Sequence, residues 1–269
     1  MSCDCQLPRD FRLTDELWEE IRPFLPPEPS HRRGGRPRTD ARRCLEAILY
    51  LLRTGVPWKA LPRCLGAPST VHDRFQEWRA AGVFERAWRR SIQLLDRQGR
   101  IDWEWQALDG SMNKAPLGGE ATGPNPTDRG KLGAKRSLLV DGHGFPLAIV
   151  TAPANTHDLK LVAQTLDARI RRPPRGVHAN LCMDRGYDAG WVHDLVRACR
   201  FVPHIRSRGE EVRRRRWGER PRRWPVERTF GWLNRCRRLL VRWERKVENH
   251  LGFLHLGIAR LLFRSARVL

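Results

Sequence analysis

The sequence has no C-x-x-C pair of cysteines, no apolar run of membrane-spanning length and comparatively few acidic residues. Its seven cysteines are scattered through apolar segments, which argues against a structural zinc site and indicates reduced thiols in a cytosolic protein. Because the chain also lacks the apolar core of a signal peptide, we expect it to be soluble, intracellular and free of membrane partners.

The scarcity of acidic residues leaves a large positive charge. Lys and Arg number 51 against 30 Asp and Glu, so the formal net charge is +21. This excess is far beyond what solubility requires and indicates a polyanionic partner, most often nucleic acid. Arginine outnumbers lysine, which favours bidentate phosphate contacts, although a GC-rich genome also raises arginine content. The hydrophobic content of 40% predicts a globular protein, large enough for one main domain and a smaller one.

Residues 1–98 predict an all-α domain that binds DNA. Helices are expected from an N-cap at Thr14 and again over residues 40–53. A short helix from Trp58, a turn at Gly66 and a helix capped by Ser69 are typical of a helix-turn-helix, with a plain helical bundle as the alternative. The DNA-contacting candidates at the start of that last helix are Thr70, His72 and Arg74, with Asp73 beside them.

A basic arm over residues 26–38 links the first two of these helices and carries Arg36 and Arg38. Arms of this composition often follow phosphates or enter a minor groove. A solvated linker is an equally good interpretation of the same residues.

Residues 99–269 predict a second domain with a mixed five-stranded sheet flanked by helices, of the α+β or α/β class. Three strands come first and the second and third are joined by a tight turn at residues 141–144; the fourth and fifth strands alternate with helices. The expected strands are 103–111, 135–140, 145–151, 177–183 and 201–205. An arginine-rich loop is expected over residues 206–223, and a last amphipathic helix over 247–268 closes the core.

Three carboxylates stand out against the basic background. Asp109 ends the first predicted strand, Asp184 ends the fourth, and Glu227 lies on a helix whose other face is apolar. If they meet, their mutual repulsion calls for a cation, and two Mg²⁺ ions about 4 Å apart would suit in-line phosphoryl chemistry. Strand-end aspartates are common, however, and a lone Glu among arginines is usually a solvated ion pair. The residues by themselves leave both interpretations open.

Several motifs resemble one known family, the D-D-E transposases of the bacterial IS-four/IS-five insertion-sequence group, which have a ribonuclease-H-like core. The resemblance covers nearly the whole chain, and its most specific part is Val226 to Leu233. The other matching segments are 108–111, 130–141, 155–158, 184–188 and 223–239.

The resemblance implies that Asp109, Asp184 and Glu227 form a catalytic triad that binds Mg²⁺, with Mn²⁺ as a substitute. It also implies that Arg223 contacts DNA near the cut. Many relatives have a tyrosine where Arg220 stands and a basic residue where Asn234 stands, and Arg235 could replace the latter. The further basic residues expected to contact DNA are Arg238, Lys131 and Lys135.

The function implied is transposition: binding of the element's terminal inverted repeats, cleavage of DNA strands and their transfer to target DNA. The implied partners are double-stranded DNA and further copies of the chain in a homodimer or larger synaptic complex, in the bacterial cytoplasm at the nucleoid. Two alternatives are a DNA-binding regulator without catalysis and a metal-dependent nuclease without strand transfer.

Overall fold

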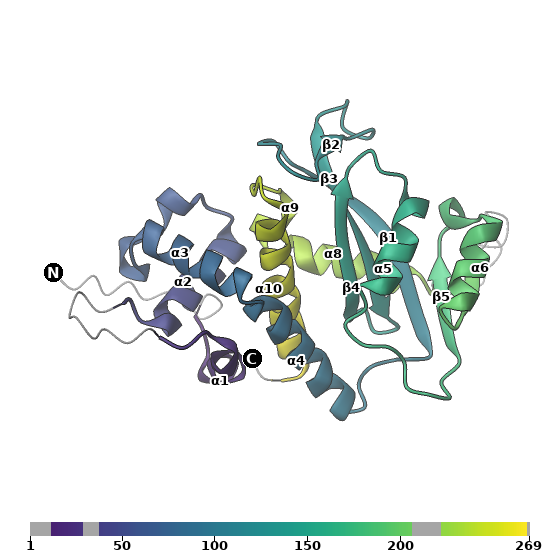
Figure 1. Cartoon of the computed structure of the whole chain (residues 1–269), viewed down its shortest axis with the longest axis horizontal. Coiled ribbons are helices and arrows are strands. Elements are labelled where there is room, and N and C mark those ends of the chain that lie inside the picture. Colours follow the sequence, from purple (N-terminus) through teal and green to yellow (C-terminus); the bar gives the residue numbers. More distant parts are fainter. Residues whose placement is uncertain (1–11, 29–37, 206–221, 268–269) are drawn as a thin grey trace. The chain divides into compact units, whose positions relative to one another are not determined.

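The computed structural model describes residues 12–28, 38–205 and 222–267, which form two compact units (Figure 1). The first unit extends to Ser91 and also includes Asn234–Leu240 and the chain from Glu248 onward. The second unit comprises Ile92–Leu233 and Val241–Val247. The domain boundary expected between residues 98 and 99 stays a prediction. The sequence placed the last helix with the second domain, but this helix packs within the first unit.

The first unit is helical, as expected. Two short connections between its helices are 3₁₀ turns, η3 (Trp58–Ala60) and η4 (Arg63–Leu65), and a third, η2 (Arg22–Phe24), extends the first helix. The α-helices are α1 (Asp15–Ile21), α2 (Ala41–Thr54), α3 (Pro68–Ala80), α4 (Val83–Arg97), α8 (Trp224–Asn234), α9 (Arg237–Leu240) and α10 (Val247–Ser265). Helix α4 continues into the second unit, and α8 begins in the second unit.

Local capping explains where these helices begin. The Thr14 hydroxyl accepts a hydrogen bond from the Leu17 amide at 3.3 Å, and the Asp40 carboxylate accepts one from the Arg43 amide at 2.9 Å. The expected cap at Ser69 is wrong, because α3 begins one residue earlier with Pro68 in its first turn, where a missing N–H costs nothing. The helix expected at Trp58 is only two 3₁₀ turns, so the helix-turn-helix stays a prediction.

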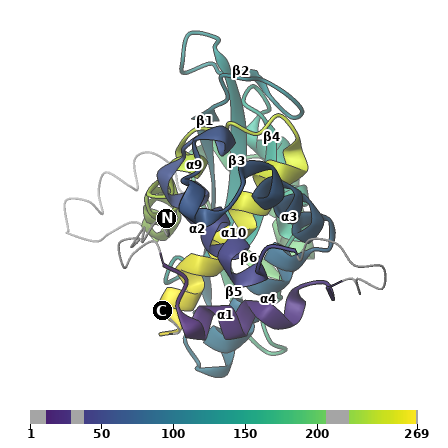
Figure 2. The same ribbon diagram turned by 90° about the vertical axis from the view of Figure 1, so that its left-hand side faces the viewer.

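Helix α10 supplies much of the first unit's core (Figure 2). Phe253 stacks on Phe75 of α3 with ring centroids 4.4 Å apart. Gly252 brings the helix so close that a Cβ there would lie 3.3 Å from the Phe75 ring. The amphipathic pattern therefore predicted a core helix correctly, and no helix among the described residues is long and apolar enough to cross a membrane.

The second unit is a mixed six-stranded sheet in the order β2-β3-β1-β5-β6, with β4 also paired to β3. Strands β1, β3 and β4 are antiparallel, whereas β1, β5 and β6 are parallel. The strands are β1 (Trp105–Lys114), β2 (Gly123–Pro124), β3 (Leu132–Asp141), β4 (Pro146–Pro153), β5 (Ala179–Met183) and β6 (Phe201–Ile205). The predicted fold class is confirmed, with the two-residue β2 as an additional strand.

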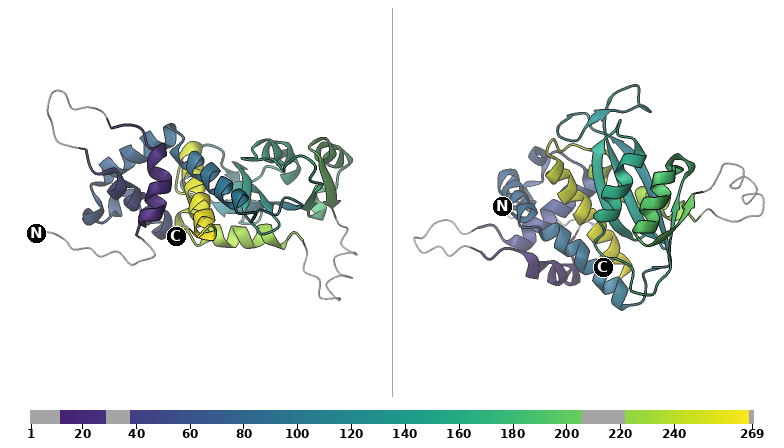
Figure 3. Two further views of the ribbon diagram at one scale, coloured as in Figure 1. Left: turned by 90° about the horizontal axis from the view of Figure 1, so that it is seen from below. Right: turned by 45° about the vertical axis from the view of Figure 1, so that its right-hand side comes forward.

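Helices cover both faces of the sheet (Figure 3). On one face the Ser137 hydroxyl accepts a hydrogen bond from Thr165 of α5 at 2.7 Å. On the other face the Arg136 guanidinium lies over the ring of Phe230 on α8. The helical segments after β4 and β5 are η5 (Asp158–Leu161), α5 (Val162–Asp167), η6 (Arg185–Tyr187) and α6 (Gly190–Ala198).

Strand β1 is longer than expected. The sequence ended it near Asp109, but it continues to Lys114 because β3 pairs with it along its whole length, with Asp109 opposite Leu138. Its parallel pairing with β5 stops at Ala107, opposite Cys182. Asp109 is therefore an internal residue of β1 that lies just beyond the point where β5 ends.

Arg242 ties the segment Val241–Val247 to the connection between β1 and β2. Its guanidinium is fully buried and donates to the carbonyl oxygens of Glu120 at 2.5 Å and Ala121 at 3.1 Å, among others. The Glu120 amide in turn donates to the Arg245 carbonyl at 2.9 Å. Burial lowers the pKa of Arg242, and this carbonyl cage provides the hydrogen bonds that a buried cation requires.

Candidate active site

Asp109 and Asp184 lie at the same level of two neighbouring parallel strands. Ala107 and Cys182 form the last pair in the β1–β5 ladder. Asp109 comes two residues after Ala107, and Asp184 comes two residues after Cys182. The Asp109 carboxylate accepts a hydrogen bond from the Gly110 amide at 2.7 Å. The Asp184 carboxylate caps η6 by accepting one from the Gly186 amide at 2.8 Å. This register places the two aspartates at the same edge of the sheet, as the sequence led us to expect.

Glu227 joins them from the first turn of α8, through an arginine. Arg223 Nη1 lies 3.5 Å from Asp184 Oδ2, and Arg223 Nη2 lies 3.5 Å from Glu227 Oε1. The guanidinium side chain is 20% exposed, whereas the two carboxylates are 38% and 49% exposed. The arginine therefore bridges two carboxylates that stay open to solvent.

The pKa of Asp109 shows how the site concentrates negative charge. The pKa of this carboxyl is raised to about 6, chiefly by burial and to a smaller extent by the charges of Asp184 and Glu227. The Gly110 hydrogen bond and the Arg223 charge act in the opposite direction. A group of acids that perturbs its own titration in this way is typical of a functional site.

The β3–β4 turn fixes the position of α8. Arg228 Nη2 donates to the His143 carbonyl at 2.5 Å, and the Thr229 hydroxyl lies 2.7 Å from the Gly144 carbonyl oxygen. A Cβ on Gly144 would lie 2.7 Å from the Thr229 hydroxyl. The two residues that follow Glu227 thus attach its helix to the turn.

Asp158 and Lys135 support the strand beside Asp109 from the opposite face of the sheet. Lys135 Nζ lies 2.8 Å from Asp158 Oδ2, and the other Asp158 oxygen occupies the space that a Cβ on Gly110 would fill. The buried Tyr187 is close by, and its pKa is raised by burial and by the charges of Asp109 and Asp158. The sequence matched both motifs that contain Asp158 and Tyr187 but gave neither residue a role.

No three His, Cys, Asp or Glu side chains of the described residues lie close enough together to ligate one metal ion. The three predicted ligands share a region without forming a closed ligand set, because Arg223 lies between two of them. Their chemistry nevertheless fits a hard divalent cation, since all donors are carboxylate oxygens. Burial raises the pKa of Asp109, and a bound cation would favour the ionised form of this carboxylate.

Comparison with known proteins agrees with this geometry. Residues 106–262 match the family described as "Transposase DDE domain", and residues 13–88 match "Putative transposase of IS4/5 family". The chain belongs to the DDE transposases of the IS4/5 family. The predicted family is thereby confirmed.

Two of the relatives of this IS4/5 transposase come from Burkholderia cepacia. One, "Putative transposase for insertion sequence element IS402", is 37% identical over 155 residues, which cover 54% of this chain and 70% of the relative. A second, "Insertion element IS402 uncharacterized 16.2 kDa protein", is 36% identical over 118 residues, 42% of this chain and 80% of the relative. Among solved structures, the catalytic domain of Mos1 mariner transposase is 13% identical, covers 68% of this chain and 93% of that chain, and has a TM-score of 0.30.

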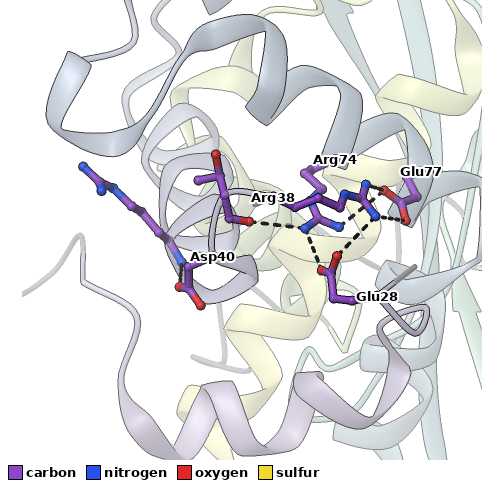
Figure 4. Close-up of polar contacts among 7 residues, drawn as sticks. Glu28, Arg38, Asp40, Arg74 and Glu77 are labelled. Carbon is purple, nitrogen blue, oxygen red and sulfur yellow. Dashed lines mark hydrogen bonds and ion pairs between the residues drawn. The ribbon is translucent and has the colours of Figure 1, made fainter. Parts of the chain in front are cut away.

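Two basic residues that the sequence placed at the transposase's DNA-binding surface are engaged with the protein's own acids (Figure 4). Arg74 is only 3% exposed and contacts Glu28 at 2.6 Å and Glu77 at 3.5 Å. Arg38 contacts the same two glutamates, at 3.3 Å and 2.5 Å, and Glu77 raises its pKa. The expectation that Arg74 is exposed was wrong, because Glu28, 46 residues away, and Glu77, one helical turn further on, pair with it inside the protein.

We predict that Arg74→Ala lowers the free energy of unfolding by about 1–3 kcal/mol, because it removes a buried side chain with its ion pairs and its hydrogen bond to the Thr39 carbonyl, while Arg38 still pairs with both glutamates. Urea denaturation followed by circular dichroism measures this. Thr70→Ala, on the same helix, should change stability by less than about 1 kcal/mol. Equal stability of wild type and Arg74→Ala would show that the contacts of Arg74 with the two glutamates do not stabilise the fold.

The other predicted DNA-contacting residues of the transposase divide into buried and exposed. Arg238 is buried, donates to the Val56 carbonyl at 2.8 Å and lies over the Trp58 and Phe253 rings. Lys135 is only 7% exposed. Both side chains are largely buried in the protein, and contact of either with DNA stays a prediction.

Four of the remaining candidates are accessible to a partner. Lys131 and Arg235 are exposed, Thr70 is partly exposed, and His72 is partly exposed against the edge of the Trp58 ring. Arg36, Arg220, most of the basic arm and most of the arginine-rich loop lie outside the described residues. DNA contact by any of these residues stays a prediction.

Proposed function

We propose that this insertion-sequence transposase binds the terminal inverted repeats of its element, cleaves DNA strands there with Mg²⁺ and joins the freed 3′ ends to target DNA. One observation carries the proposal: Asp109, Asp184 and Glu227 come from three elements to one place, and a single arginine bridges two of them. Membership of the DDE family implies a divalent metal, and Mg²⁺, which Mn²⁺ can replace, is the ion that an all-oxygen donor set favours.

In this proposal the three carboxylates hold the cations, which supply a more acidic water molecule and stabilise charge at the scissile phosphate when bound. The Gly110 and Gly186 amides orient two of the carboxylates, and the turn at residues 141–144 holds the third. Arg223 is placed to contact a phosphate beside the carboxylates. We propose direct attack by water and then by the 3′-hydroxyl, without a covalent intermediate on a serine or tyrosine.

We propose double-stranded DNA and further copies of the chain as partners, because two element ends must be brought together for joining. The net charge of +21 and the exposed Lys131 and Arg235 support the DNA partner.

The test is cleavage of supercoiled plasmid that carries the element's own ends, with wild type beside Asp184→Asn. We expect metal-dependent nicking at the ends by wild type, its loss in the variant, and unchanged DNA binding by both. If both proteins bind the ends and neither cuts with Mg²⁺ or Mn²⁺, the chain is a regulator. Cleavage without joining of pre-cut ends would identify a nuclease.

A further inference from the structure

A cavity of about 510 Å³ opens in the second unit at the end of the sheet opposite the carboxylates. Its walls come from the segment before β5 and from the segment between α6 and β6. Four arginines line it, with Asp167 as the one acidic residue among the described lining residues: Arg169, Arg172, Arg175 and Arg200.

None of these four arginines has an ion-pair partner within 4 Å among the described residues. Their neighbours differ: Arg171 pairs with Asp96 at 2.7 Å and Arg197 pairs with Asp194 at 3.1 Å. Arg169 is fixed in the wall, where its Nε donates to the Leu166 carbonyl at 2.5 Å and its guanidinium lies over the Phe201 ring. The cavity therefore holds positive charge that the described part of the chain leaves uncompensated.

The backbone of Arg200 gives an independent indication. Its φ is 65°, in the left-handed region, and it comes directly after the C-cap of α6, Cys199. Glycine is the residue that this position normally takes, because any other side chain is strained there. Arg200 therefore contributes its side chain to the cavity lining from a backbone conformation that glycine would adopt at lower cost.

We propose that this cavity binds a phosphate of the DNA backbone, as a second contact remote from the cut. Guanidinium groups match phosphate oxygens, and the volume accommodates a phosphodiester with its sugars. No aromatic side chain is found among the described lining residues, so the cavity lacks the aromatic platform on which single-stranded bases usually stack.

The location sets the distance between the two DNA contacts. Seven residues of extended chain separate Val177 at the cavity from Asp184, which is roughly 20 Å, or about six base pairs along the duplex. A phosphate so far from the scissile bond would fix the direction in which the duplex leaves the active site. This inference rests on the proposed function, because it takes the element's DNA as the ligand.

The experiment measures binding of a labelled duplex carrying the element's end by fluorescence anisotropy over a range of salt concentrations. All proteins carry Asp184→Asn, so that the duplex stays intact. We expect Arg200→Gly to weaken binding roughly tenfold and to lower the salt slope by about one. The matched control is Arg197→Ala, which removes the same charge from α6 outside the cavity and should leave the slope unchanged.

Arg200→Gly also excludes a folding artefact, because glycine relieves the left-handed strain and the Tm should stay equal or rise. If Arg200→Gly and Arg197→Ala both bind like the parent, the proposal is overturned while the proposed function stands. If Arg200→Gly loses thermal stabilisation by inorganic phosphate but keeps DNA affinity, the cavity is a small-anion site and the DNA contact is wrong. If no variant or parent binds the duplex, both proposals fail.

Discussion

Asp109→Asn should abolish cleavage and at the same time stabilise the protein. We expect a loss of at least about a thousandfold in metal-dependent nicking, because a metal-holding carboxylate worth several kcal/mol is removed. We also expect the free energy of unfolding without metal to rise by about 1–3 kcal/mol near pH 8. The reason is that burial and two neighbouring carboxylates raise the pKa of Asp109 to about 6. At pH 8 the ionised carboxylate therefore destabilises the folded protein, and a neutral Asn does not.

The stabilisation should depend on pH in a defined direction. Because the folded-state pKa lies above the ordinary value of 3.8, the folded chain binds this proton more tightly than the unfolded chain does. Asp109 therefore makes wild type less stable as pH rises from about 4 to about 6, and Asp109→Asn lacks this contribution, whereas the raised pKa of Asp141 affects both proteins alike. Urea titrations at several pH values measure the difference, and an Asn variant that is less stable than wild type at pH 8 would contradict the electrostatic explanation.

Gly119→Ala should be the most destabilising alanine substitution of a glycine in the second unit. A Cβ there would lie 2.5 Å from the Arg245 Cα and 2.8 Å from its carbonyl carbon, and closer still to the carbonyl oxygen. These are backbone atoms held by the Arg242 cage, so they cannot rotate away as a side chain could. The φ of 112° adds strain of its own, and we expect a loss of about 3–5 kcal/mol, measured by urea denaturation.

Gly130→Ala is the matched control for this substitution. Gly130 also has a positive φ, 71°, but nothing lies within 4 Å of the position of its Cβ. It should lose only about 1 kcal/mol from backbone strain. Equal losses at the two glycines would show that conformation, and not the close approach of residue 245, determines the cost.

The sequence predicted most of the fold because its patterns are local. Alternating and periodic apolar residues located the strands and helices, and a tight turn placed β3 beside β4. Strand order brings Asp109 and Asp184 to one level of the sheet, whereas their meeting with Glu227 in a metal site stays a prediction. The end of β1 was missed because pairing with β3 extends the strand, and no local signal reports a partner.

The basic residues were harder to place because the environment of a charge is a tertiary property. Arg74 is neutralised by Glu28, 46 residues away, and Lys135 by Asp158, 23 residues away. Arg238 is accommodated by aromatic rings far from it in sequence. On a chain with 51 basic residues, composition predicts the kind of partner but not which residues meet it.

The attachment of α8 to the β3–β4 turn limits how this enzyme can vary in length. Hairpin turns usually tolerate insertions, yet Arg228 and Thr229 bind the carbonyls of His143 and Gly144 directly. One inserted or deleted residue between Asp141 and Phe145 would shift both anchors and carry Glu227 with them, although neither strand nor any carboxylate had changed. The turn thus acts as a spacer of fixed length for the proposed active site, and relatives that remain active should keep the three residues between Asp141 and Phe145.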